Sequence, residues 1–235
     1  AFTGCDNLRC LFLVDSIERI EAYAFAGCQN LANLTLSSRL KKIPHDCFYY
    51  SPISEIIIPD SIEIIEDNAF KNGGSVSVNL QLGKNVKSIG VEAFSQRQIS
   101  EVIIPEKVEE IKASAFSNNT SLKKFICKGE NISFGQNVLG GCSQLEELTI
   151  PYIKEHNFLG YLFTATTSTI DNSKVVSSSL KSVTLTNANK IPEEMFSNCP
   201  QITNYSLNEG IVSIGSKAFY NDYVMQSITI PSTVI

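Results

Sequence analysis

The sequence predicts a repeat solenoid, mainly β, in which about ten repeats of 22 to 24 residues stack along one axis. Three observations predict this fold class. The phrase AFTGCDNL at residues 1–8 returns as AFAGCQNL at residues 24–31, an apolar residue that is usually Phe recurs at nearly constant steps, and an alternating apolar segment follows each copy. Self-similarity at a period of about 20 to 50 residues is typical of stacked repeat architectures.

One position, which we call the anchor, sets the phase of every repeat. The anchor is usually Phe, and the residue before it is usually Ala. The repeat departs from this pattern at Leu139 and in the degenerate segment FLGYLF at residues 158–163. The predicted anchors are Phe2, Phe25, Phe48, Phe70, Phe94, Phe116, Leu139, Phe163, Phe196 and Phe219.

A short strand is predicted after each anchor. Apolar residues follow with the spacing seen at Leu31, Leu34 and Leu36, and the alternation at the end of this run indicates a strand with one buried face. A single repeat buries too few apolar side chains to offset the entropy of ordering its backbone, so the repeats must stack with their strands parallel.

An exception to the period lies between Phe163 and Phe196, where the step is longer by about eleven residues. The segment 164–179 is mostly Ser and Thr, and the repeat resumes in phase after it. We therefore expect a loop inserted in one repeat of a single domain spanning residues 1–235. A functional loop remains open, but surface loops absorb extra length at little entropic cost, which favours a tolerated insertion.

The two ends of the chain divide the repeat. The first residues supply the anchor half of a repeat, and ITIPSTVI at residues 228–235 supplies a strand half. We expect Phe2 and the last strand to lack neighbours, as in a fragment of a longer array without polar capping repeats.

Composition argues against several function classes. The net charge is −5, and the Lys and Arg residues are scattered, which disfavours nucleic acid as a partner. The sequence contains no apolar run long enough for membrane insertion. His45 and His156 lie far apart with no nucleophile at an equivalent place, and the seven cysteines form no CxxC pair. We expect no enzyme activity, no cofactor and no metal site.

Four cysteines recur three residues after an anchor, namely Cys5, Cys28, Cys142 and Cys199. Recurrence at one repeat position indicates a small buried apolar group, which a free thiol supplies. Buried thiols are therefore favoured over disulfides, although Cys5 and Cys28 lie one repeat apart and could come within bridging distance.

The combined pattern, LxxLxLPxxLxxIxxxAFxxCxxL, is clearest in ISEIIIPDSIEIIEDNAF and ISEVIIPEKVEEIKASAF. It resembles the BspA-like, or Treponema pallidum-type, class of leucine-rich repeat over nearly the whole chain. The resemblance implies a curved leucine-rich-repeat stack with a parallel sheet on its concave side and little helix. It also implies surface proteins of host-associated bacteria and some parasitic protists, proposed to bind host matrix proteins or other cells.

Candidate binding residues are those between the buried aliphatics of each strand, because successive side chains of a strand point to opposite faces. They form two columns, in which apolar residues such as Ile57 and Ile103 are flanked by acids. An apolar patch with an acidic rim fits a protein-binding surface, and strand propensity of β-branched residues is the open alternative. The predicted ligand-binding residues are Phe12, Thr35, Glu55, Ile57, Gln81, Glu101, Ile103, Lys124, Ile126, Glu147 and Thr149.

The sequence therefore favours a noncatalytic protein-binding or adhesion module of a cell-surface or secreted protein. Its partner would be a protein or glycoprotein, on host matrix or another cell surface. The alternative is an intracellular leucine-rich-repeat scaffold or sensor domain of a larger multidomain protein. Free cysteines fit a reducing compartment, whereas glycosylation would exclude the cytosol; the five sequons begin at Asn33, Asn118, Asn119, Asn131 and Asn204.

Overall fold

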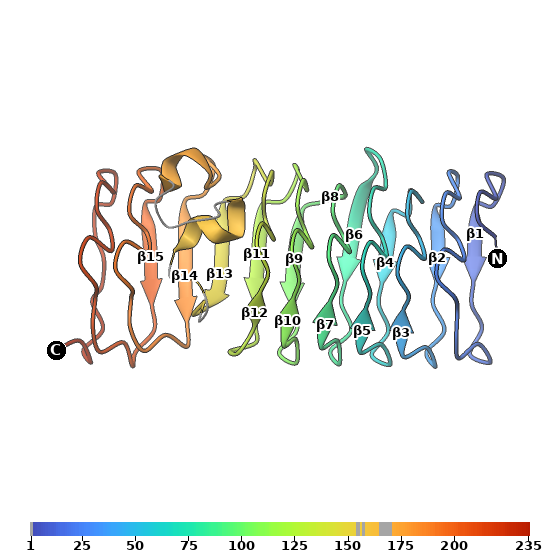
Figure 1. Ribbon diagram of the computed structural model, residues 1–235, viewed down its shortest axis with the longest axis horizontal. Coiled ribbons are helices and arrows are strands. Elements are labelled where there is room, and N and C mark those ends of the chain that lie inside the picture. Colours follow the sequence, from blue (N-terminus) through green and yellow to red (C-terminus); the bar gives the residue numbers. More distant parts are fainter. Residues whose placement is uncertain (1, 154–155, 157, 165–170) are drawn as a thin grey trace.

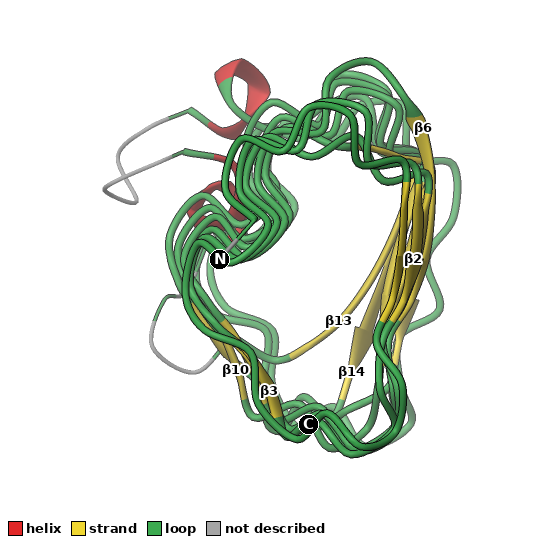
Figure 2. Cartoon of the chain, turned by 90° about the vertical axis from the view of Figure 1, so that its right-hand side faces the viewer, coloured by secondary structure: helices red, strands yellow, loops and turns green. Residues whose placement is uncertain are grey.

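The computed structural model describes residues 2–153, 156, 158–164 and 171–235, and it is a parallel β-solenoid with almost no helix. Figure 1 shows the coils lying side by side along one long axis, with the two chain ends at opposite ends of the stack. Viewed along that axis, each coil runs around a closed outline with longer strands on one side and short strands on another (Figure 2). The predicted repeat solenoid is confirmed.

The longer strands carry the predicted alternation, and each lies parallel to its partner one repeat away. Leu11 pairs with Leu34, and Phe125 pairs with both Val102 and Leu148, so equivalent positions of successive repeats are neighbours. These strands are β1 (Cys10–Phe12), β2 (Asn33–Thr35), β4 (Glu55–Ile57), β6 (Ser77–Gln81), β8 (Gln98–Ile99), β9 (Glu101–Ile104), β11 (Lys124–Cys127), β13 (Glu147–Pro151), β14 (Ser182–Thr186) and β15 (Asn204–Leu207).

A second parallel sheet is built from two-residue strands in the order β12-β10-β7-β5-β3. A bridge between Ile191 and Ile214 repeats this pairing nearer the C-terminus. The strands are β3 (Lys42–Ile43), β5 (Ile64–Ile65), β7 (Ser88–Ile89), β10 (Glu110–Ile111) and β12 (Ser133–Phe134).

The anchors form a ladder on the remaining side of the coil. From Phe2 to Phe116, successive rings stack with centroids 5.1 to 5.6 Å apart. From Phe2 to Leu139, each anchor N–H donates to the carbonyl oxygen of the residue before the next anchor, as Phe116 does to the Val138 oxygen and Leu139 to the Leu162 oxygen. This pattern confirms Leu139 as an anchor, and its bond to Leu162 places Phe163 next in the series.

The chain leaves this pattern at the degenerate repeat. Residues Leu159–Phe163 form the 3-10 helix η1, and it is the Leu159 N–H that donates to the Met195 oxygen, at 3.0 Å. Of the predicted insertion 164–179, residues 165–170 lie outside the described residues. Beyond them, Asn172–Lys174 form the 3-10 helix η2, whose buried Asn172 accepts from the Gly160 N–H and donates to the Ser197 oxygen. The second half of the insertion is thus packed onto the stack.

Most anchors are flanked by residues in the left-handed backbone region, two positions before and two positions after. Around Phe94 these are Glu92, with φ 52°, and Gln96, with φ 57°. Such values are uncommon for residues other than Gly. The two left-handed residues turn the chain sharply on both sides of the anchor, which directs the ring into the core.

At the ends of the stack, Phe2 stacks on Phe25 and remains 54% exposed, and Ile230 is 46% exposed. Both residues are more exposed than their equivalents inside the stack. The strand predicted within the described residues 228–235 does not form, since the last strand of the chain is β15.

Candidate interaction surface

The predicted ligand-binding residues lie on the outer face of the longer strands, which we call the long-strand face. In one column Lys124 lies between Glu101 and Glu147, and in the adjoining column Ile126 lies between Ile103 and Thr149. The same register pairs Phe12 with Thr35, Glu55 with Asn79, and Ile57 with Gln81. Within each hydrogen-bonded group of strands, the structure therefore brings the predicted residues together.

Exposure divides the predicted set. Phe12 is 68% exposed, Ile57 47% and Ile103 42%, and the side chains of Thr35, Glu55, Gln81, Glu101 and Glu147 are also exposed. Lys124, Ile126 and Thr149 are half-buried. Lys124 Nζ lies 2.9 Å from Glu147 Oε1, and this hydrogen bond raises the pKa of Lys124.

The long-strand face is divided, where the sequence predicts two unbroken columns. Its strands form three hydrogen-bonded groups, β1-β2, β4-β6-β8 and β9-β11-β13-β14-β15. Ile57 is therefore separated from Ile103 by Gln81 and by the break between β6 and β9. The directly paired apolar residues on this face are Ile103 and Ile126.

A one-residue change of register accompanies the break between β6 and β9. Ser77 and Val78 pair with Gln98 and Ile99, which lie 21 residues later, whereas the column positions Asn79 and Glu101 are 22 residues apart. The departure lies in the coil of β6, where Asn79 comes nine positions after the anchor Phe70, whereas Glu55 and Glu101 come seven positions after Phe48 and Phe94. Beyond this change of register, β6 and β9 are not paired.

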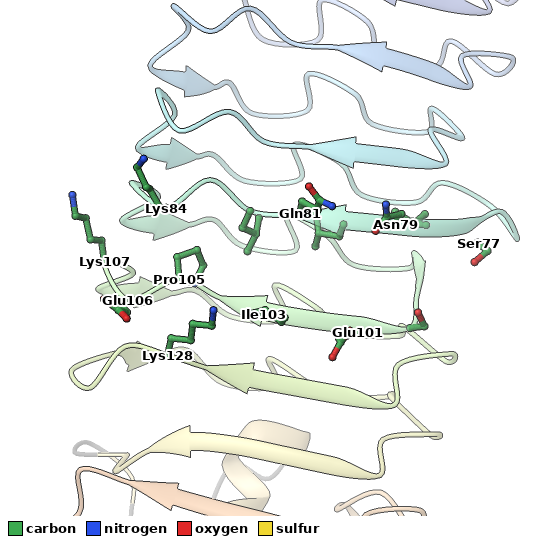
Figure 3. A pocket seen from close by; sticks show the side chains of 14 residues that line it. Ser77, Asn79, Gln81, Lys84, Glu101, Ile103, Pro105, Glu106, Lys107 and Lys128 are labelled. Atoms are coloured by element: carbon green, nitrogen blue, oxygen red, sulfur yellow. The ribbon is translucent and has the colours of Figure 1, made fainter.

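A groove of about 690 Å³ fills this break, lined by β6, β9 and the loops that follow them. Figure 3 shows Lys84, Lys107 and Lys128 gathered where the strands end, with Glu101 and Ser77 at the opposite end. Lys84 Nζ lies 2.8 Å from Asp60 Oδ2, and Lys107 Nζ donates to Asn85 Oδ1 at 2.7 Å. The hydrogen bond with Lys84 lowers the pKa of Asp60, and the same bond raises the pKa of Lys84. This groove was not predicted from the sequence. The one sequence feature that accompanies it is the repeat step of 24 residues between Phe70 and Phe94.

In five coils the residue three positions after the anchor is a buried hydrogen-bond donor, where the sequence predicts a small apolar group. Cys28 Sγ donates to the Phe2 oxygen, Ser51 Oγ to the Phe25 oxygen, and Cys142 Sγ to the Phe116 oxygen. Each donor thus serves the anchor carbonyl of the preceding coil. A buried carbonyl needs such a partner, which explains why Cys, Ser, Asn and Arg all occur at this position.

All seven cysteines are free thiols, as predicted. Five are buried, while Cys5 is half-buried and Cys10 is exposed on the long-strand face. Burial raises the pKa of Cys47 and of Cys142 to about 12. These thiols are therefore protonated near neutral pH and are poor nucleophiles.

The two histidines lie in different surroundings. His45 Nδ1 lies 3.1 Å from Asp46 Oδ2, and the His156 ring stacks on Tyr161 with centroids 3.6 Å apart. Over the part of the chain that the structure describes, no three His, Cys, Asp or Glu residues are grouped as metal ligands would be. Nor do the described residues include a helix long and apolar enough to span a membrane.

Comparison with known proteins finds leucine-rich repeat proteins, in agreement with the solenoid described above. A family model described as BspA type leucine rich repeat region, in six copies, matches residues 1–78, 74–175 and 154–235. A leucine-rich repeat protein from Bacteroides ovatus is 24% identical with a TM-score of 0.59; the match covers 100% of this chain and 63% of that chain.

Two further solved structures are similar. A leucine rich cell surface protein from Faecalibacterium prausnitzii is 19% identical, with 88% of this chain and 62% of that chain covered and a TM-score of 0.44. The T. pallidum leucine rich repeat protein is 17% identical, with 79% and 76% covered and a TM-score of 0.41. No curated protein matches the sequence.

Proposed function

This chain belongs to the BspA-type leucine-rich repeat family, and from that premise we propose that it is a noncatalytic module that binds a protein or glycoprotein partner through its long-strand face. The proposal places the module on a cell-surface or secreted protein, as the family resemblance implies, with host matrix or another cell surface as the source of the partner.

One observation carries the proposal: Ile57 and Ile103 are 47% and 42% exposed on a face whose main chain is held by strand pairing. Glu55 and Glu101 lie two positions before them and are also exposed. Protein interfaces commonly combine an apolar centre with a polar rim. A rigid sheet presents such side chains without the entropic cost of ordering a loop on binding.

The test is binding of the chain to immobilised fibronectin, fibrinogen, laminin and collagen, measured by surface plasmon resonance. The double variant Glu55→Lys/Glu101→Lys reverses the charge of the rim, and we expect it to weaken binding at least about tenfold. The matched control Glu109→Lys/Glu193→Lys makes the same charge change at exposed residues away from the face. Equal binding by both double variants would contradict a role for the face, and no binding to any of the four proteins would contradict matrix adhesion.

A second candidate function is favoured by the free thiols. Seven unpaired cysteines, five of them buried, fit the reducing compartment of an intracellular scaffold or sensor. The intact mass of the protein from its native source distinguishes the two functions. A glycan on exposed Asn33, Asn131 or Asn204 excludes the cytosol. Asn119 is unsuited to glycosylation in the folded chain, because its buried amide donates to the Phe94 and Phe116 oxygens.

A further inference from the structure

We propose that the groove between β6 and β9 binds an extended segment of a partner protein, parallel to the two strands, with a carboxylate at the C-terminal end of the segment against Lys107 and Lys128. This inference rests on the proposed function, because it assigns the part of the long-strand face that the partner enters.

The main-chain N–H and C=O groups of β6 and β9 point toward the groove. Where strands of this face are paired, the buried residues offer their N–H groups to the following coil, as Leu13 does to the Thr35 oxygen and Ile58 to the Gln81 oxygen, both at 2.9 Å. The outward residues face the preceding coil, since successive residues of a strand bond to opposite sides. Leu80 and Leu82 should therefore face β9, and Glu101 and Ile103 should face β6.

These edges are open. Residues 79–82 and 101–104 are all described, and no main-chain hydrogen bond joins the two segments. The side chains beside the opening are also less covered, since Leu80 and Leu82 are half-buried. Their equivalents are buried, namely Ile56 and Val102 for Leu80, and Ile58 and Ile104 for Leu82. An open strand edge is a template for an added strand, and main-chain pairing of this kind is a common way to bind an extended peptide.

The groove has room for a short segment. Its volume of about 690 Å³ lies within the usual range of about 300 to 1,000 Å³ for ligand sites. It is closed at one end, where Ser77 and Val78 still pair with β8, and a rise of about 3.3 Å per residue limits the contact along residues 79–82 to roughly four to six residues. A folded domain would not enter this space, whereas a terminus or an extended loop would.

Positive charge lies at the open end of the groove. Lys84 is paired with Asp60, while the Lys107 side chain donates, among the residues that the structure describes, only to the neutral amide of Asn85. The Lys128 side chain forms no ion pair and no hydrogen bond within the described residues, although its main-chain N–H donates to the Ile104 oxygen. Glu106 offsets one of the two remaining positive charges. Figure 3 places these lysines where β6 and β9 end and Glu101 where β9 begins. A carboxylate at the lysine end therefore makes the segment run in the same direction as every strand of this face.

The probe for this site is a fluorescein-labelled octapeptide of alternating Thr and Val that ends in Asp-Glu with a free carboxylate. Binding to the full chain is followed by fluorescence anisotropy. We expect Lys107→Glu/Lys128→Glu to weaken binding at least about tenfold, because the carboxylate loses its partners and meets like charge. The control Lys190→Glu changes the same residue type at an exposed position elsewhere and should stay within about twofold.

Three further peptides separate the contributions. Amidating the C-terminus tests the terminal carboxylate, and replacing Asp-Glu by Asn-Gln tests the side-chain carboxylates. Methylating alternate amide nitrogens removes the donors for strand pairing and should abolish binding. Equal affinity of the methylated peptide, equal affinity of the Lys107→Glu/Lys128→Glu variant, or no binding of the acidic peptide at about 1 mM would each overturn the proposal.

Two outcomes distinguish this proposal from the proposed function. If matrix proteins bind and Lys107→Glu/Lys128→Glu leaves that binding unchanged, the module is a binder but the groove is not its site. If the acidic peptide binds in the groove while the matrix proteins do not bind, the groove is supported as a binding site and matrix adhesion is contradicted. Concentration-dependent dimerisation that the lysine variant abolishes, measured by sedimentation, would instead assign the groove to a second copy of this chain and overturn the peptide proposal.

Discussion

The guanidinium group of Arg97 occupies the space that Gly73 leaves by having no side chain. A Cβ atom at Gly73 would overlap Arg97 Nη1. Arg97 is fully buried; its Nε donates to the Phe70 oxygen and its Nη1 to the Ile53 oxygen at 3.5 Å, while Nη2 has no partner among the described residues. Burial lowers the pKa of Arg97 to about 9. Arg97 therefore joins three coils, and this arrangement depends on glycine at position 73.

Gly73→Ala should destabilise the chain by about 2 to 3 kcal/mol, because the added methyl group forces the buried guanidinium out of its place. The measurement is urea denaturation followed by circular dichroism. The double variant Gly73→Ala/Arg97→Ser should recover part of this loss, since Ser51 occupies the same repeat position and donates to the anchor carbonyl of the coil before it. Ser75→Ala, at an exposed neighbour, is the control. A Gly73→Ala chain as stable as wild type would show that the two residues are not coupled.

The anchor ladder predicts a graded series of substitutions. Phe48 is fully buried between Phe25 and Phe70, so Phe48→Ala should cost about 3 to 5 kcal/mol. Phe48→Leu should lower the free energy of unfolding by less, because Leu139 shows that a buried Leu can fill an anchor position without ring stacking.

Phe2→Ala is the matched control for this series, since Phe2 is 54% exposed and stacks on a single neighbour. Its cost should be well below that of Phe48→Ala in the same denaturation experiment. Equal losses at the two positions would mean that ring stacking and burial do not set the stability of the ladder.

Much of the fold could be predicted because a solenoid repeats each residue environment. The anchors, the strand columns and the repeat that carries the insertion all follow from one period, and Leu139 keeps its predicted place. At Phe163 the prediction holds only in part, because Leu159 makes the bond to Met195. The columns of candidate binding residues follow from strand alternation in the same way. Their role in binding stays a prediction.

The features that the sequence did not predict arise where individual residues depart from the repeat pattern. The groove accompanies a one-residue change of register between β6 and β8, and Arg97 fits against Gly73 in the neighbouring coil. A repeat pattern records what the coils share, so it does not show a contact that two residues make in one coil alone. The donor role of Cys28 and Cys142 was also not predicted. In the sequence, a Cys that only fills space cannot be told from a Cys that donates a hydrogen bond to a carbonyl oxygen. Ser51 at the equivalent position was the sign that a donor is needed there.

Asp222 predicts a pH dependence of stability. Its buried carboxylate accepts from the Tyr205 hydroxyl at 2.6 Å and from the Cys199 N–H at 2.9 Å, and burial raises its pKa above 3.8. Because the folded state holds this proton more tightly than the unfolded state, the contribution of Asp222 is most favourable below the unfolded pKa and is lost as pH rises through the raised value.

Asp222→Asn should therefore stabilise the chain relative to wild type at pH 7 and do so less at about pH 4. The amide oxygen keeps the Cys199 bond, and the amide nitrogen donates to the Tyr205 oxygen. Melting temperatures of both proteins at the two pH values give the comparison. A difference that does not change with pH would mean that Asp222 titrates alike in the folded and unfolded chain.

Thiol labelling should separate the cysteines by burial. Cys10 is exposed and Cys5 is half-buried, so these two should react with a disulfide reagent in the native chain. Cys28, Cys47, Cys127, Cys142 and Cys199 should react only in denaturant, because burial excludes the reagent and raises their pKa values. Recovery of fewer than seven thiols in denaturant would show a disulfide, and Cys10→Ser and Cys5→Ser identify which native signal belongs to which residue.

The left-handed residues beside the anchors predict a substitution effect that no contact explains. Gln96 is exposed, with φ 57° and its N–H bonded to the Ser117 oxygen at 2.9 Å. A β-branched residue is strained in this region, so Gln96→Val should cost about 1 to 2 kcal/mol although it removes no buried atom. Gln96→Asn is the matched control, because Asn tolerates this backbone conformation and occupies the equivalent positions 72, 118, 198 and 221. If the Val and Asn variants unfold at the same urea concentration, the left-handed turn does not persist in solution and the anchor must be held by packing alone.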